Sequence, residues 1–207
     1  VERAIESGIP VVNCYGSTRV PALDVVMGDA EGGCYRATKY LLELGHRKIA
    51  FVKVRESGIS KRRFEGCQRA LEEFGVTASP DFLIEVDDYS QESGYLGAKT
   101  LFARWDLPTA IFAFSEQLAI GVLRAARESG VKIPEDLSLV GVDDVIGEVL
   151  QPPLTSVRIS THEAGKTAAM LLFERIEKGF LSQPRRVILE ERLVVRGSTQ
   201  QARISGR

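Results

Sequence analysis

Short apolar runs alternate with longer amphipathic stretches along most of this chain. Short, mostly apolar runs bounded by polar residues or glycine are typical of buried strands, whereas apolar positions at helical spacing predict helices. This pattern predicts strands at residues 9–14, 22–28, 48–54, 82–86, 109–114 and 137–142, and helices at 30–44, 61–74, 91–104 and 116–129. Strands separated by helices of about ten to fifteen residues indicate βαβ units and a parallel sheet.

The alternation changes after Pro152 and Pro153. A short strand is predicted at 155–159, a last helix at 161–178 and an extended segment at 186–195. Asp29, Ser90 and Ser115 are expected to cap the helices that follow them, because their side-chain oxygens can accept backbone N–H bonds of the first turn.

A polar side chain follows each of four consecutive predicted strands: Arg63, Tyr89, Ser115 and Asp143. If the strands are parallel, their carboxyl ends share one edge of the sheet, and ligands of open α/β sheets bind at that edge. We therefore predict that these four residues surround one small ligand.

Asp143 and its neighbour Asp144 directly follow a strongly apolar strand. Burying a carboxylate without partners costs several kcal/mol, so at least one of the two is expected to face a cleft and accept hydrogen bonds. A turn or helix cap is an equally open interpretation. A catalytic acid/base pair is disfavoured, because adjacent side chains at a strand end point in opposite directions.

Arg63 falls in the first turn of its predicted helix, where the helix dipole disfavours a cation. This favours a role in binding an anion or hydroxyl, or in pairing with Asp143, over a role in helix stability. A solvated surface arginine is the alternative. Tyr89 offers a ring that can stack on a flat ligand face, although half-exposed loop tyrosines are common.

Composition excludes several classes of protein. With 207 residues the chain can form one large or two small domains, and 44% hydrophobic with 27% charged residues is ordinary for a globular protein. A net charge of −1 gives no basic excess for binding nucleic acid. No run of about 18 apolar residues predicts a membrane span. Cys14, Cys34 and Cys67 are widely spaced, which predicts free thiols in a reducing cytosol.

The motifs do not favour an enzyme. Residues 160–167 match a phosphate-binding loop except that Ser160 replaces its first glycine, and Ser160 with Glu163 predicts a helix start instead. His46 and His162 have no partner at ligand spacing, and there is no nucleophile elbow. We therefore expect no catalytic residues, metal or cofactor.

Several motifs follow one another in a distinctive order, including Leu44-Gly-His-Arg-Lys-Ile-Ala-Phe51, Arg63-Phe-Glu-Gly66, residues 88–95, residues 133–144 and Leu193-Val-Val-Arg-Gly-Ser-Thr199. In this order they resemble the lactose-repressor-type (LacI/GalR) family of transcriptional regulators, over about residues 9–199. The resemblance implies a periplasmic-binding-protein-like α/β fold with two parallel-sheet subdomains and a cleft between them.

The same resemblance implies roles for the four candidate residues. Asp143 and Arg63 would bind effector hydroxyls or charges, Tyr89 would stack on the effector, and Ser115 would occupy a position where the family often has Asn. Ile159 falls where many members carry a polar ligand-contacting side chain. These two departures imply a somewhat less polar pocket.

The resemblance also divides the chain. Residues 1–29 and 160–187 would be a truncated remnant of the N-terminal subdomain, 30–159 and 188–199 the C-terminal subdomain, and 200–207 a flexible tail. By the same resemblance, the helix-turn-helix headpiece and the opening βαβα of the family would not be part of this chain. The unpaired edge and apolar helix faces of the remnant would then need cover, from a second copy or a missing segment.

The implied function is the effector-binding and dimerising domain of a cytoplasmic bacterial repressor. It would bind a sugar or sugar derivative, form a homodimer, contact operator DNA only through the missing headpiece, and not associate with a membrane. The alternative is a periplasmic sugar-binding protein of a transporter, which shares the fold, but free cysteines disfavour an oxidising periplasm. A sugar-modifying enzyme lacks a nucleophile or metal constellation.

Overall fold

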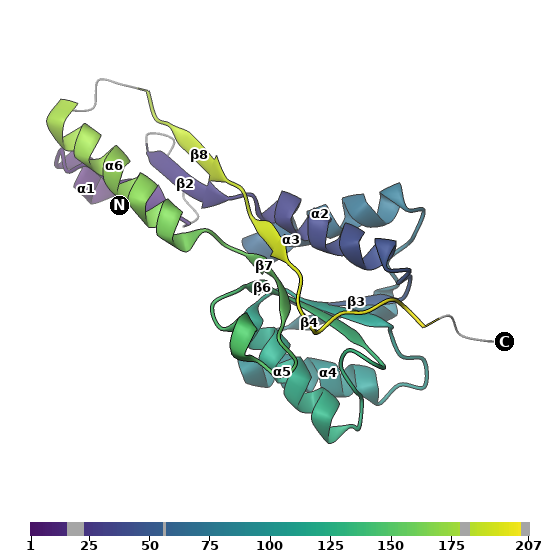
Figure 1. Cartoon of the computed structure of the whole chain (residues 1–207). Coiled ribbons are helices and arrows are strands. Elements are labelled where there is room, and N and C mark those ends of the chain that lie inside the picture. Colours follow the sequence, from purple (N-terminus) through teal and green to yellow (C-terminus); the bar gives the residue numbers. More distant parts are fainter. Residues whose placement is uncertain (16–22, 56, 179–182, 204–207) are drawn as a thin grey trace. The chain divides into compact units, whose positions relative to one another are not determined.

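The computed structural model describes residues 1–15, 23–55, 57–178 and 183–203 (Figure 1). The chain forms two compact units: unit 1 contains Val1–Asp29 and Ile159–Glu191, and unit 2 contains Ala30–Arg158 and Arg192–Arg207. The chain therefore passes from one unit to the other three times, and neither unit is a continuous segment.

Unit 2 is built on a six-stranded sheet with the strand order β4-β3-β5-β6-β7-β9. The strands are β3 (Ile49–Val54), β4 (Leu83–Val86), β5 (Ala110–Ala113), β6 (Ser138–Asp143), β7 (Thr155–Arg158) and β9 (Arg192–Val194). All pairs are parallel except β7 with β9. The prediction that four successive strands lie parallel in one sheet is confirmed, so their carboxyl ends share one edge.

Helices cover both faces of this sheet, with α2 (Ala30–Glu43) and α3 (Gly58–Glu73) on one face and α4 (Gln91–Phe102) and α5 (Glu116–Glu128) on the other (Figure 1). Two short 3₁₀ turns, η1 (Pro80–Phe82) and η2 (Gly147–Val149), complete the unit. On the α3 face, Phe51 packs edge-on against Phe64 with ring centroids 5.4 Å apart. On the other face, Val52 and Ile111 pack with α4 and α5. Burial on both faces explains why the strands read as continuous apolar runs.

Two glycines allow α4 and α5 to pack closely. A Cβ at Gly94 would lie 2.3 Å from the carbonyl oxygen of Leu118, and one at Gly121 would lie 2.1 Å from that of Gln91. Neither contact is possible between real atoms. Any larger residue at these positions would therefore push the two helices apart. This would displace the N-terminus of α5, which Ser115 caps.

Unit 1 has a parallel three-stranded sheet with the order β1-β2-β8. Its elements are α1 (Glu2–Glu6), β1 (Val12–Cys14), β2 (Asp24–Gly28), α6 (Thr161–Lys178) and β8 (Arg186–Leu189). Ala164 and Leu171 of α6 pack on Val26 of β2. Arg175 of α6 binds both carboxylate oxygens of buried Asp24, at 2.9 and 2.8 Å, and this ion pair holds the pKa of Asp24 well below its usual range.

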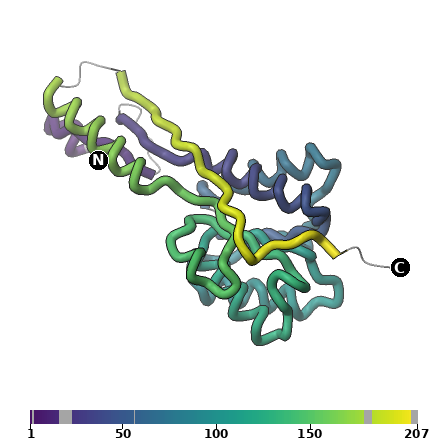
Figure 2. Tube along the Cα trace, viewed as in Figure 1, coloured from purple at the N-terminus to yellow at the C-terminus, as the bar shows by residue number. Residues whose placement is uncertain are grey.

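The predicted extended segment 186–195 contains two strands, β8 and β9. Gly28 pairs with Leu189, so β8 belongs to unit 1, whereas β9 pairs with β7 in unit 2 (Figure 2). The chain thus crosses between units at Glu191 and not at Val187, and the earlier crossing places Ile159 in unit 1.

The start of the predicted tail is anchored to unit 2. The N–H of Ala202 donates to the carbonyl of Leu44, and Arg203 pairs with Asp136 at 3.1 Å. The expectation of a flexible tail is therefore wrong for residues 200–203, and 204–207 lie outside the described residues. Within the described ranges, no helix is long and apolar enough to cross a membrane.

Candidate functional site

The helix that carries Arg63 begins earlier than predicted. α3 starts at Gly58, and the Oγ of Ser57 caps it by accepting the backbone N–H of Ser60 at 3.3 Å. Arg63 therefore lies in the second turn, so the prediction that it lies in the first turn, where the helix dipole disfavours a cation, is wrong. The capping serine three residues before Ser60 was the available sequence signal for this start.

The guanidinium of Arg63 is buried at the carboxyl edge of the sheet. The residue is 6% exposed, and its Nη1 donates to the carbonyl of Phe114 at the end of β5. Its Nη2 lies 3.7 Å from Oδ1 of Asp143, a long ion pair. Its Nε is buried, and no group in the described part of the chain accepts a hydrogen bond from it. A buried cation gains free energy from further acceptors, so a ligand oxygen would be favoured here.

Ser115 follows β5 and caps α5. Its Oγ accepts the backbone N–H of Leu118 at 3.1 Å, and the residue is 4% exposed. The capping role predicted for Ser115 is confirmed. It leaves the hydroxyl proton available to an acceptor, and the positive end of the α5 dipole faces this edge.

The two adjacent aspartates have different environments. Asp143 and Asp144 adopt positive φ angles of 98° and 59°, a conformation that costs about 1–3 kcal/mol for residues other than glycine. Oδ2 of Asp143 accepts the backbone N–H of Glu116 at 3.3 Å, and the Asp143 side chain is 32% exposed. The Asp144 side chain is fully buried and pairs with Arg196 at 2.6 Å and Arg158 at 2.7 Å. Of the two carboxylates, only that of Asp143 is open to a ligand.

Glu116, which the sequence did not single out, holds this edge together. It is 2% exposed, and its carboxylate accepts the backbone N–H groups of Val145 and Ile146 at 3.0–3.2 Å. The loop after Asp144 is thereby fixed to the start of α5. An acidic residue in a first helical turn is common, so no sequence signal distinguished this role.

Tyr89 lies at the same edge but makes no contact with the other three residues that the structure records. Its hydroxyl is 2.9 Å from Oγ of Ser57 and 2.8 Å from Oγ of Ser60, one turn before Arg63 on α3. The adjacent Asp88 accepts bonds from Ser90 and Ser93, which lower its pKa to about 2. The structure thus brings Arg63, Ser115 and Asp143 together and places Tyr89 beside the start of α3. Stacking by Tyr89 stays a prediction.

A small cavity lies beside the start of α3. It has a volume of about 290 Å³ and is lined by Lys53, Val54, Ser57, Gly58, Lys61 and Phe64. It shares Ser57 with the contacts of Tyr89, whereas Arg63, Ser115 and Asp143 do not line it. The candidate site lies with Arg63, Ser115 and Asp143, because their hydrogen bonds fix the geometry of the polar groups at this edge.

The remaining sequence candidates have structural roles. Residues 161–167 form the first turns of α6, so the match to a phosphate-binding loop is accidental. His46 is 2% exposed and bonds to Oγ1 of Thr109 at 2.9 Å and to the carbonyl of Gln200 at 3.0 Å. Across the described ranges, no group of three or more His, Cys, Asp and Glu residues is placed to hold a metal ion.

Comparison with known sequences gives a consistent result. Residues 38–199 match the family model described as a periplasmic binding protein-like domain. The transcriptional repressor PurR of Aliivibrio salmonicida is 34% identical over 171 residues, which are 82% of this chain and 51% of that protein. The ribose operon repressor of Haemophilus influenzae is 33% identical over 200 residues, 96% of this chain and 59% of that protein. The chain thus spans about half the length of these curated relatives.

Solved structures agree with the sequence comparison. A LacI family transcriptional regulator from Enterococcus faecium with bound ribose superposes with a TM-score of 0.89 at 30% identity, covering 98% of this chain and 75% of that chain. A complex of the transcriptional regulator CelR with cellobiose gives a TM-score of 0.84 at 33% identity, covering 94% of this chain and 60% of that chain.

Proposed function

The chain belongs to the LacI/GalR family of periplasmic-binding-protein-like effector domains, and from this we infer that it is the effector-sensing part of a cytoplasmic bacterial transcriptional repressor. The curated relatives are repressors, which does not favour the alternative of a transporter's sugar-binding protein. We further infer that the chain binds its ligand and does not convert it.

The observation that carries this proposal is the pairing of Arg63 with Asp143 beside the α5 N-terminus. A guanidinium supplies donors only and a carboxylate supplies acceptors only, so side by side they match neighbouring hydroxyls of a sugar or nucleoside. A buried hydrogen bond holds Arg63 and a partly buried one holds Asp143 before any ligand arrives, which lowers the entropic cost of binding. Ribose and cellobiose bound to the two structural relatives support this ligand class.

The repressor function also requires a dimer and DNA, which we include in the proposal. Val145, Ile146 and Val149 follow the candidate site and are 77%, 42% and 73% exposed. Neighbouring apolar side chains in water mark a surface for another protein, and a second copy of the chain is the partner expected from the family. Contact with operator DNA would belong to a part of the full-length repressor outside this chain.

Calorimetric titration with pentoses, hexoses and nucleosides tests the proposal. Asp143→Asn keeps a residue type that tolerates positive φ and removes the charge, and Arg63→Lys keeps a charge and removes the planar donor set. Each variant should bind the active ligand about 100-fold more weakly, as expected for losing a charged hydrogen bond.

The matched control is Asp87→Asn, because Asp87 also follows a strand at this edge but its side chain is 89% exposed. It should bind normally, and thermal melts monitored by circular dichroism should show all three variants folded. Wild-type affinity in both Asp143→Asn and Arg63→Lys would disprove the site.

A further inference from the structure

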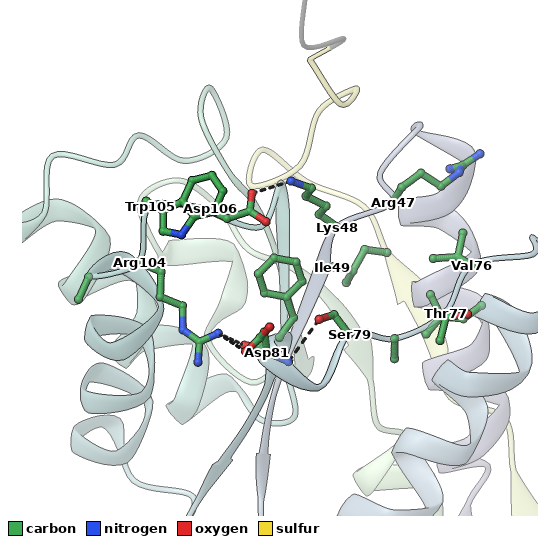
Figure 3. A pocket seen from close by; sticks show the side chains of 14 residues that line it. Arg47, Lys48, Ile49, Val76, Thr77, Ser79, Asp81, Arg104, Trp105 and Asp106 are labelled. Carbon is green, nitrogen blue, oxygen red and sulfur yellow. Dashed lines mark hydrogen bonds and ion pairs between the residues drawn. The ribbon is translucent and has the colours of Figure 1, made fainter.

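A larger cavity lies at the amino edge of the unit 2 sheet, the edge away from Arg63 and Asp143 (Figure 3). Its volume is about 700 Å³, within the range of roughly 300–1,000 Å³ typical of small-molecule sites. The segment Arg104 to Asp106 after α4 lies on one side of it, and Val76 to Ser79 after α3 lies on the other (Figure 3).

The floor of this cavity is apolar. Ile49, Leu71 and Phe82 line it and are 3%, 3% and 7% exposed, so they belong to the packed interior. Ala78 and Ala103 also line it, and their small side chains leave the space above the floor open. A charged group placed on this floor would lose its water without gaining a partner.

The exposed indole of Trp105 lies at the rim of the cavity. Trp105 is 97% exposed, although an aromatic side chain of this size can bury about 150–250 Å² in a contact. Figure 3 shows it next to Asp106, on the same side of the cavity as Arg104. An aromatic ligand is the partner that would use both a flat indole face and an apolar floor.

The charged groups at the rim are already paired. Lys48 binds Asp106 at 2.6 Å, and Arg104 binds Asp81 at 3.1 Å. Arg47 donates to the carbonyls of Leu42 and His46 at 2.8 and 2.9 Å. The C-terminal ends of α3 and α4 also face this edge, and their partial negative charge disfavours an anion. Among the described residues, the rim has three cations and two carboxylates, and the partial negative charge of the helix C-termini opposes the surplus cation. The rim therefore offers hydrogen-bond donors and acceptors but little attraction for either sign of charge.

We propose that the amino-edge cavity is a second ligand site for a small aromatic molecule without net charge. The ligand ring packs on the floor formed by Ile49, Leu71 and Phe82, with Trp105 against its open face. Its polar substituents bond to the paired charges of the rim. This site is separate from the effector site, because none of its lining residues belongs to the carboxyl edge.

Fluorescence provides a direct test, since Trp105 is the single tryptophan of the chain. Benzyl alcohol is the probe. Cyclohexylmethanol is the non-aromatic analogue, and benzoate and benzylamine are the charged analogues. Benzyl alcohol should quench the emission and shift it to shorter wavelength in a saturable way, with a Kd on the order of 1 mM for so small a molecule. The three analogues should bind at least about threefold more weakly than benzyl alcohol.

Variants assign the signal to the cavity. Ala78→Leu fills the cavity and should abolish saturation. Asp143→Asn should leave the fluorescence titration unchanged, which separates this proposal from the effector site. A linear, non-saturating response, an equal response to cyclohexylmethanol, or normal saturation in folded Ala78→Leu would each overturn the proposal.

Discussion

At the carboxyl edge of the unit 2 sheet most of the candidate polar side chains are buried and hydrogen-bonded to nearby backbone groups, whereas at the amino edge the charged side chains lie in water around an open cavity. Arg63, Ser115 and Glu116 are 6%, 4% and 2% exposed at the first edge. The Lys48 and Asp106 side chains are 54% and 45% exposed at the second. The polar groups of the carboxyl edge are therefore held in place before a ligand binds. The hydrogen bonds that hold them also contribute to the stability of the fold.

The direction of the helices explains part of this difference. In parallel α/β units the helix N-termini lie at the carboxyl edge of the sheet, where their free N–H groups bind acceptors. Ser115 and Asp143 both accept such N–H groups at the start of α5. At the amino edge the helices end, and arginines bond to their carbonyls, as Arg47 does at the end of α2. Substitutions at the two edges should therefore have effects of different size.

The largest effect is expected from Asp144→Asn. This change leaves the largely buried guanidinium of Arg196, whose side chain is 13% exposed, without its carboxylate, and loss of one partner of a buried pair costs about 3–5 kcal/mol. Urea unfolding monitored by circular dichroism measures the cost. Asp143→Asn is the matched control and should cost less than about 1 kcal/mol, because its side chain is partly exposed and its ion pair is long. Equal costs would contradict the division of roles between the two aspartates.

Ser115→Ala should lower the free energy of unfolding by about 1 kcal/mol, because the cap of α5 is lost. Ser115→Asn keeps a capping side chain and should restore most of that stability. Urea midpoints of the two variants and the wild type give the comparison. Equal midpoints for Ser115→Ala and the wild type would show that the cap contributes nothing to this edge.

His46 is the exception at the amino edge, and its effect should depend on pH. Burial lowers its pKa below the ordinary 6.5, so the unfolded state takes up a proton that the folded state does not. Stability due to His46 is therefore full above the unfolded pKa and is lost as pH falls below it, by at most about 1.4 kcal/mol per pH unit. Urea unfolding between about pH 7.5 and pH 5.5 should show this slope for the wild type and a smaller slope for His46→Gln.

Substitutions at the exposed rim should have the smallest effect. Trp105→Ala and Lys48→Ala should each change the free energy of unfolding by less than about 0.5 kcal/mol, because the indole is 97% exposed and the ion pair is a surface pair. Thermal and urea unfolding measure both. A loss above about 1.5 kcal/mol in either variant would mean that the rim is part of the folded core.

The sequence predicted most of unit 2 because its sheet is buried on both faces, which makes the strands visible as apolar runs, and because Ser90 and Ser115 mark helix starts. It placed Arg63, Ser115 and Asp143 at one edge from element order alone. The binding roles of these residues remain predictions.

The errors have local causes. A run of extended residues does not specify which sheet each part of it joins, so 186–195 was predicted only as an extended segment and was divided between the units at 187/188. The start of α3 was missed because the cap at Ser57 precedes a glycine, which is a weak helix former. The amino-edge cavity is lined by residues from several connections that share no pattern, so no periodicity indicated it.

The split of the C-terminal extended segment into β8 and β9 has a consequence for how the protein is made. On the ribosome, β3 to β6 emerge one after another and can pair as soon as they leave the exit tunnel. β2, which is synthesised before all of them, has to wait for β8 before its second neighbour exists. Domains generally fold in the order of their synthesis, but here β1 and β2 are made before the first strand of unit 2, and their sheet stays incomplete until β8 has emerged. Nascent unit 1 therefore stays exposed to proteases and chaperones while β3 to β7 are being made.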